Sequence, residues 1–198
     1  MTELTDFQRK TAAFFPEISL SFGESLAKHT SFRIGGPAEV MAFPKNGEEL
    51  SNLLNKSALL DCKPAILGAG TNVLAPDKGV PGLTVCLKDC LDGIERVDET
   101  HIRVMAGVTM TRCAMFAAKE GLSGLEFAHG IPGTIGGGVY MNAGAYGGEI
   151  AQVCAEAELM TGSGVRYTRS REGMAFSYRH SCLEKTGDIV VSALLELT

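Results

Sequence analysis

The sequence predicts a fold of mixed helices and strands. An alternating segment, a segment with an apolar helical stripe and a short apolar run follow one another over residues 38–67, which predicts strand, helix and strand. A second helix is predicted over residues 107–121 and a β-hairpin over residues 156–168. The turn at Gly68 leads to Pro76 instead of a helix, which argues against the doubly wound dinucleotide-binding fold.

Composition limits the classes of partner. The 198 residues are enough for one domain or two small subdomains with a hydrophobic core, and 45% hydrophobic with 21% charged residues indicates a globular protein. The net charge of −5 argues against nucleic acid or an anionic membrane as the main partner. An anionic ligand would therefore have to be held by local features.

The six cysteines show neither a C-x-x-C pair nor the paired Cys/His spacing of zinc sites. We therefore predict reduced, mostly buried thiols and no metal. No pattern typical of a signal peptide or a membrane span is visible, so we expect a cytoplasmic protein.

The N-terminal part predicts one helix and an extended segment. Residues 4–15 place Leu4, Phe7 and Phe14 near one helical stripe. Residues 18–28 predict an extended lead-in. The next predicted helix has a buried stripe, which is formed by Leu50, Leu53, Leu54 and Ala58.

The remaining elements follow from alternation and capping residues. Thr109 is the predicted N-cap and Gly121 the predicted C-cap of the helix over residues 107–121. Further strands are predicted at residues 64–67, 82–87, 101–106 and 189–197.

Two glycine-containing segments are candidates for ligand binding. The turn Gly68–Asn72 directly follows a predicted buried strand, so its N–H groups could cradle a phosphate oxygen, although such a turn is more often only a turn. The stretch from Gly130 to Glu149 holds 8 of the 24 glycines, interleaved with Ile, Val, Tyr and Met. That composition predicts a packed segment with an exposed backbone and is not typical of a flexible linker.

Few side chains suggest catalysis. His129 borders the glycine-rich stretch but has no identifiable carboxylate partner, and Ser123 and Ser181 lack the context of an activated nucleophile. Arg179, in Phe176-Ser-Tyr-Arg-His-Ser, is either a solvated surface residue or a group that recognises a carboxylate.

Four motifs together resemble a known family. They are His29-Thr-Ser-Phe-Arg-Ile-Gly-Gly-Pro-Ala, Leu67-Gly-Ala-Gly-Thr-Asn-Val-Leu, the Gly130–Glu149 stretch and Tyr178-Arg-His-Ser. Their order over about 150 residues resembles the bacterial UDP-N-acetylenolpyruvoylglucosamine reductases, which implies an α+β fold of the vanillyl-alcohol oxidase / p-cresol methylhydroxylase type with two FAD-binding subdomains. Residues 1–28 would then form the N-terminal helix and lead-in, 29–97 the first subdomain and 98–198 the second.

The resemblance also implies a cofactor site and a reaction. Hydride would pass from NADPH to noncovalent FAD and then to the enolpyruvyl group of a UDP-sugar, and Arg179 would stabilise the resulting negative charge. The residues that the resemblance assigns to FAD are Gly68, Ala69, Gly70, Thr71, Asn72, Ile131, Pro132, Gly133, Thr134, Gly136, Gly137, Asn142, Gly144, Ala145 and Val190.

In that family a serine, assisted by a glutamate, supplies the proton from a third domain that follows the FAD-binding region. The chain ends at Thr198, so neither role falls on Ser181 or Glu184. Two alternatives remain: another oxidoreductase of the same fold, or a nucleotide-binding module without catalysis. The sequence does not indicate an oligomeric state.

Overall fold

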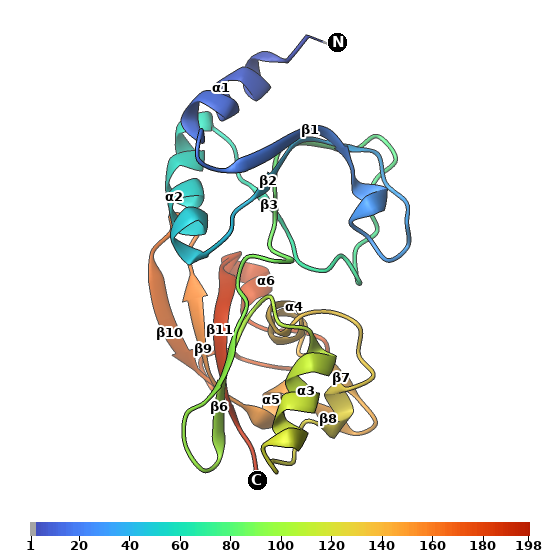
Figure 1. Cartoon of the computed structure of the whole chain (residues 1–198), viewed down its shortest axis with the longest axis vertical. Coiled ribbons are helices and arrows are strands. Elements are labelled where there is room, and N and C mark those ends of the chain that lie inside the picture. The colour runs from blue at the N-terminus through green and yellow to red at the C-terminus, as the bar shows by residue number, and fades with distance from the viewer. Residues whose placement is uncertain (1–2) are drawn as a thin grey trace. The chain divides into compact units, whose positions relative to one another are not determined.

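The computed structural model describes residues 3–198, which form two compact units (Figure 1). The described part of the first unit ends at Cys90 and also includes Gly162–Gly164, and the second unit comprises Leu91–Thr161 with Val165–Thr198. The sequence analysis placed the division after residue 97. In the structure it falls earlier, because β5 (Ile94–Arg96) pairs with β6 (His101–Met105) of the second unit.

Within the described residues, the first unit contains a sheet with the strand order β1-β2-β4-β3. β1 runs antiparallel to β2, whereas β4 is parallel to both β2 and β3. The strands are β1 (Ser19–Ser25), β2 (Pro37–Phe43), β3 (Ala65–Leu67) and β4 (Val80–Cys86). The predicted extended lead-in is thus an edge strand of this sheet.

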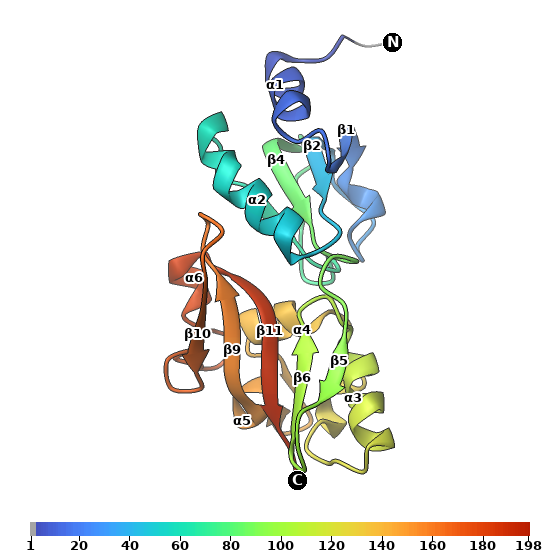
Figure 2. The ribbon, with the colours of Figure 1, turned by 60° about the vertical axis from the view of Figure 1, so that its left-hand side comes forward.

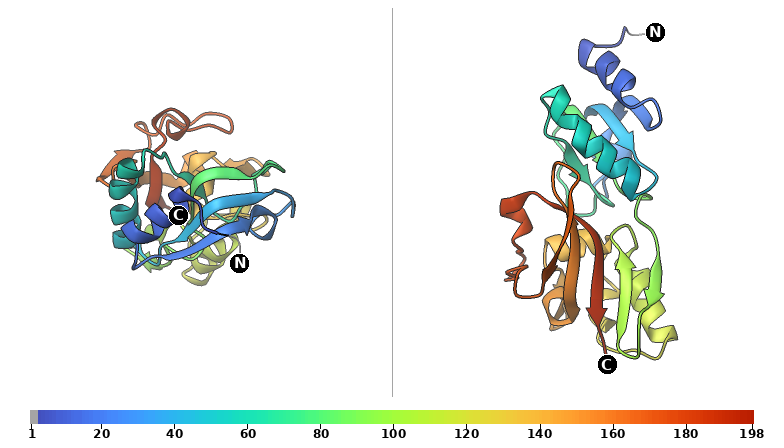
Figure 3. Two further views of the ribbon diagram at one scale, coloured as in Figure 1. Left: turned by 90° about the horizontal axis from the view of Figure 1, so that it is seen from above. Right: turned by 90° about the vertical axis from the view of Figure 1, so that its left-hand side faces the viewer.

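In the described part of the first unit there are two α-helices, α1 (Asp6–Phe14) and α2 (Gly47–Ser57), and Figures 2 and 3 show α2 alongside the sheet. Short 3₁₀ turns are η1 (Leu26–Lys28) and η2 (Ala58–Leu60). Asn46 caps α2, because its side chain accepts hydrogen bonds from the N–H groups of Glu48 and Glu49.

The buried stripes of α1 and α2 differ in part from the prediction. Leu50, Leu53 and Leu54 are buried as predicted, but Ala58 is exposed because α2 ends at Ser57. The helix predicted from residue 4 was wrong at Leu4, which lies before α1 because the helix begins only after its N-cap, Thr5. The buried residue of α1 is Thr11.

The second unit contains an antiparallel sheet with the order β10-β9-β11-β6-β5, best seen in Figure 2. β11 (Ile189–Glu196) pairs with both β6 and β9, and most of its residues are buried, so this strand carries much of the core. β9 (Cys154–Met160) and β10 (Arg166–Ser170) form the predicted hairpin, which is confirmed.

Helix α3 (Met110–Lys119) confirms the predicted N-cap, because the Thr109 hydroxyl accepts from the N–H of Arg112 at 3.2 Å. Glu120 is its C-cap, and Gly121 follows with φ of +73°. The other elements of the second unit are η3 (Glu126–Ala128), α4 (Ile135–Tyr140), β7 (Gly144–Ala145), β8 (Gly148–Glu149), α5 (Ile150–Val153) and α6 (Leu183–Thr186).

The glycine-rich stretch contains a helix, α4, which the sequence analysis did not predict. Glycine is a poor helix former, so local propensity gave no signal. Two tertiary contacts favour the helix: α4 packs against β11 and β6, and the N–H of Gly136 donates to the carbonyl of Ala106 at 2.9 Å.

The prediction of reduced, mostly buried cysteines is confirmed. All six thiols are free; Cys86, Cys90, Cys113 and Cys154 are buried, and Cys62 and Cys182 are half-buried. Burial raises the pKa of Cys90, Cys113 and Cys154 to about 12. No helix among residues 3–198 has the length and apolar character required to cross a membrane.

Candidate cofactor and substrate site

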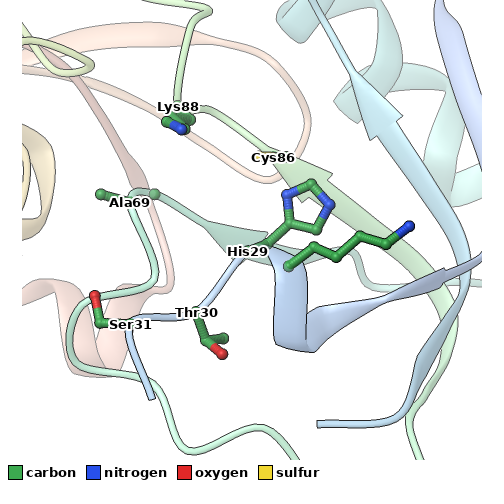
Figure 4. A pocket seen from close by; sticks show the side chains of 8 residues that line it. His29, Thr30, Ser31, Ala69, Cys86 and Lys88 are labelled. Atoms are coloured by element: carbon green, nitrogen blue, oxygen red, sulfur yellow. The ribbon is translucent and has the colours of Figure 1, made fainter. Parts of the chain in front are cut away.

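The first unit contains a pocket of about 140 Å³ at the meeting point of two loops (Figure 4). One loop follows η1, and the other is the predicted Gly-x-Gly turn after β3. The residues that line the pocket are Lys28, His29, Thr30, Ser31, Gly68, Ala69, Cys86 and Lys88. Two residues that the resemblance assigns to the cofactor, Gly68 and Ala69, therefore lie in this pocket.

Glycine at position 70 allows the two loops to cross. Gly70 has φ of +63°, and a Cβ on it would lie 2.0 Å from the carbonyl oxygen of His29. The N–H of Ser31 donates to the carbonyl of Gly70 at 3.0 Å. The shape of the turn thus depends on backbone contact between the loops, which any side chain at residue 70 would disrupt.

The donors around the pocket suit an anionic ligand. Lys28 and Lys88 bring ammonium groups, although the Lys28 Nζ lies 3.4 Å from the Glu24 carboxylate. His29 is hydrogen-bonded to the same carboxylate at 3.0 Å, which lowers the pKa of Glu24. Ammonium groups and hydroxyls are donors that bind phosphate oxygens, so the residue types that line this pocket make it a candidate phosphate site despite the negative net charge.

In the second unit, consecutive glycines of α4 face different neighbours. A Cβ on Gly136 would lie 2.9 Å from the Ala106 Cβ, and one on Gly138 would lie 2.8 Å from the Met110 sulfur. Gly137 is exposed, and a Cβ there would meet only the Thr134 hydroxyl, at 3.8 Å. Gly136 therefore packs directly on Ala106 and Gly138 on the Met110 side chain, whereas Gly137 leaves an open surface of backbone.

Thr134 caps this helix and is itself buried. Its hydroxyl accepts from the N–H of Gly137 at 3.5 Å, a long hydrogen bond at the first turn of α4. Thr134 also forms an isolated bridge with Thr109, next to the start of α3. The predicted cofactor residue Thr134 thus connects the starts of two helices.

The Arg179 side chain contacts the glycine-rich stretch. Its Nη2 donates to the carbonyl of Gly144 at 2.6 Å, and its guanidinium carbon lies 5.5 Å from the centre of the Tyr178 ring. Arg179 has φ of +53°, an uncommon value for a residue with a side chain. Both Tyr178 and Arg179 are exposed, so the cation is accessible from solvent.

The other residues assigned to the cofactor are placed as follows. Gly133 accepts from the N–H of Met110 at 3.0 Å, Ile131 donates to Ala128 at 3.2 Å, and Ala145 pairs with Gly148 in the small β7–β8 hairpin. Val190 is buried in β11 opposite Leu159. Pro132 and Asn72 are exposed, Thr71 is half-buried, and Asn142 is buried.

The assigned residues therefore form two groups, one in each unit. The structure brings Gly68, Ala69 and Gly70 together in the first unit, and Arg179 together with Gly144 in the second. Sequence reasoning missed the pocket residues Thr30 and Ser31, although the motif that begins at His29 was a signal for them.

The remaining polar candidates have structural contacts. The Ser181 hydroxyl is buried and donates to the carbonyl of Tyr140 at 2.6 Å. His180 lies 2.9 Å from Glu184, and the His129 carbonyl accepts from the Thr111 hydroxyl at 2.7 Å. Among the residues that the structure describes, no cluster of three or more His, Cys, Asp or Glu residues could hold a metal ion.

Comparison with known proteins identifies the family. Residues 38–168 match the family model described as FAD binding domain. This chain belongs to the FAD-binding domain family. The predicted α+β fold of the vanillyl-alcohol oxidase / p-cresol methylhydroxylase type is confirmed by this match and by solved structures. One of these, alkyldihydroxyacetonephosphate synthase, is 20% identical with a TM-score of 0.66 over 100% of this chain and 41% of that chain, and indicates the fold alone.

The more similar proteins are reductases. The chain is 43% identical over 175 residues to the UDP-N-acetylenolpyruvoylglucosamine reductase of Halalkalibacterium halodurans. This alignment covers 88% of this chain and 58% of the relative. The UDP-N-acetylenolpyruvylglucosamine reductase (MurB) of Thermus caldophilus is 30% identical with a TM-score of 0.72, over 92% of this chain and 62% of that chain. The chain thus spans about 60% of the length of these relatives.

Proposed function

We propose that this chain is the FAD-binding portion of an NADPH-dependent reductase that converts UDP-N-acetylglucosamine enolpyruvate to UDP-N-acetylmuramate, a cytoplasmic step of peptidoglycan precursor synthesis. Membership in the FAD-binding domain family and 43% identity to a reductase of this name support the proposal. The observation that carries it is the hydrogen bond between Arg179 and Gly144. It joins the proposed catalytic cation to the segment proposed to hold the flavin.

The cofactor would be bound noncovalently, and each unit carries a segment proposed to contact it. In the first unit, Gly68, Ala69 and the neighbouring hydroxyl and ammonium groups would hold phosphate oxygens. In the second unit, the exposed backbone at Gly137 would allow close approach of an aromatic ring system, because no Cβ intervenes. Bound there, FAD would supply hydride transfer between NADPH and the enolpyruvyl double bond.

Arg179 would act on the substrate. Its guanidinium presents a planar fork of N–H donors that matches a carboxylate. One N–H is used by Gly144, and the fork carries others that can bind the carboxylate of the enolpyruvyl group. Stabilising the negative charge that develops there would lower the barrier, an effect commonly worth about 3 kcal/mol.

The test is NADPH oxidation by the full-length protein, with and without UDP-N-acetylglucosamine enolpyruvate. We expect substrate-dependent oxidation in the wild type and a loss of at least about 100-fold in kcat for Arg179→Ala. Arg103→Ala is the matched control, since Arg103 lies on β6 and its Nε is 3.9 Å from the Glu95 carboxylate, a weak ion pair outside the candidate site. Equal turnover in both variants, or oxidation that ignores the substrate, would contradict the proposal.

A further inference from the structure

Asn142 is fully buried and bridges two segments with its side-chain amide. Its Oδ1 accepts from the N–H of Ala151 at 2.9 Å, and its Nδ2 donates to the carbonyl of Ser177 at 2.9 Å. The donor and the acceptor end of the amide thus each contact protein backbone. Asn142 also has φ of +44°, a left-handed value that asparagine tolerates better than most residues.

The segment that Asn142 contacts carries Arg179. Ser177 and His180 form a bridge in which each N–H donates to the other's carbonyl, both at 3.1 Å. Tyr178 and Arg179 make up the turn between them, and Arg179 has the strained φ of +53°. A hairpin this short is not stable alone, so its geometry depends on external contacts.

Three hydrogen bonds attach this turn to the glycine-rich stretch. They run from the Asn142 amide to Ser177, from Arg179 to Gly144 and from the Ser181 hydroxyl to Tyr140. Of these three, the Asn142 bond is the one that joins a fully buried side chain to the hairpin bridge itself. Breaking it would leave a buried amide unsatisfied, and that cost keeps the hairpin closed.

We infer that Asn142 is a positioning residue: its amide holds the Ser177–His180 hairpin closed and so fixes the Arg179 guanidinium over Gly144. This role rests on the proposed function of Arg179, but the hairpin contact can be tested without turnover. It differs from the direct cofactor contact that the resemblance implies for Asn142. Replacing a positioning residue would loosen the hairpin, whereas replacing a residue that contacts the cofactor would lower the affinity for FAD.

The decisive variant is Asn142→Asp, measured by hydrogen exchange in the full chain. Aspartate keeps the size, the left-handed tolerance and the acceptor for Ala151, but it replaces the donor with an oxygen that faces the Ser177 carbonyl. We expect exchange at the Ser177 and His180 amides to accelerate about tenfold or more, while Ala151 stays protected. Trypsin cleavage after Arg179 should accelerate in parallel.

Two further variants control for general destabilisation. Ser192→Ala removes a buried hydroxyl that donates to Glu158 in the same unit, and it should leave exchange in the hairpin within about twofold of wild type. Asn142→Gly suits the positive φ and removes both contacts, so it should expose Ala151 as well as the hairpin. If Asn142→Asp does not fold, Asn142→Gly provides the hairpin result.

Kinetics then separate this role from the proposed function. In the full-length reductase, Asn142→Asp should slow reduction of the enolpyruvyl substrate about tenfold, with FAD affinity and flavin reduction by NADPH within about threefold of wild type. Unchanged exchange and cleavage in the hairpin, or a loss of FAD affinity that accounts for the whole defect, would overturn the inference. If the wild type shows no reductase activity, the proposed function fails, yet the exchange result still decides whether Asn142 holds the hairpin.

Discussion

Each unit carries a candidate ligand-binding segment, and the two segments are built by different means. In the first unit, two loops cross at Gly70 and leave a pocket between backbone segments. In the second unit, a short glycine-rich helix offers an open backbone, and side-chain hydrogen bonds attach the turn of Arg179 to the same stretch. Glycine thus serves close packing of backbone in the first unit, whereas at Gly137 it leaves room for a ligand.

The largest expected effect is that of Gly70→Ala. The new Cβ would meet the His29 carbonyl at 2.0 Å and would also hold alanine at a positive φ. We expect a loss of more than about 3 kcal/mol in the free energy of unfolding of the first unit, measured with urea. Gly23→Ala is the matched control, because its φ of +66° is similar but no atom lies within 4 Å of the new Cβ.

The control should lose only about 1–2 kcal/mol, the cost of the left-handed backbone. Equal losses in both variants would show that the crossing of the loops contributes nothing beyond backbone strain.

At Gly137 we expect a smaller effect on stability than at Gly70, but a clear effect on FAD binding. Gly137→Ala should leave unfolding within about 1 kcal/mol of wild type, because the position is open and helical. If the flavin approaches this backbone, the same variant should weaken FAD binding about tenfold or more, measured by titration calorimetry. Gly136→Ala should instead destabilise the fold by about 1–3 kcal/mol, because its Cβ meets Ala106.

If Gly137→Ala binds FAD with the affinity of the wild type, the open backbone at Gly137 does not contact the cofactor.

The last prediction concerns thiol labelling, which reports on each unit separately. In the native protein the half-buried Cys62 and Cys182 should react first, and thiols with a pKa of about 12 should react at least about 100-fold more slowly. With rising urea, Cys90 reports opening of the first unit, and Cys113 and Cys154 report opening of the second. Mass spectrometry of labelled peptides measures the labelling rates in the native protein and in urea. If Cys90, Cys113 and Cys154 become reactive at the same urea concentration, the two units unfold as one.

Local signals predicted most elements, and non-local contacts determined the rest. The cap at Thr109 and the β9–β10 hairpin were predictable because their signals lie within a few residues. Helix α4 was not, because it depends on packing against β11 and on a hydrogen bond to Ala106. The edge strand β1 was assigned only as extended, since pairing with β2 joins segments that are distant in sequence.

The candidate site follows the same rule. Glycine spacing indicated both candidate ligand-binding segments, and the resemblance pointed to Arg179. The hydrogen bonds from Asn142 to Ser177 and from Ser181 to Tyr140 span 35 and 41 positions in the sequence, so no local pattern could reveal them. Ser181 illustrates this, because the sequence analysis considered it only for catalytic roles, whereas its buried hydroxyl donates a hydrogen bond to the Tyr140 carbonyl.

The central claim is that this chain binds FAD through its glycine-containing segments. The most direct measurement is the absorbance spectrum of the purified chain after incubation with FAD and removal of unbound flavin. The account predicts a yellow protein with one FAD per chain, released intact on denaturation because no covalent bond holds it. A colourless protein after this treatment would contradict the account.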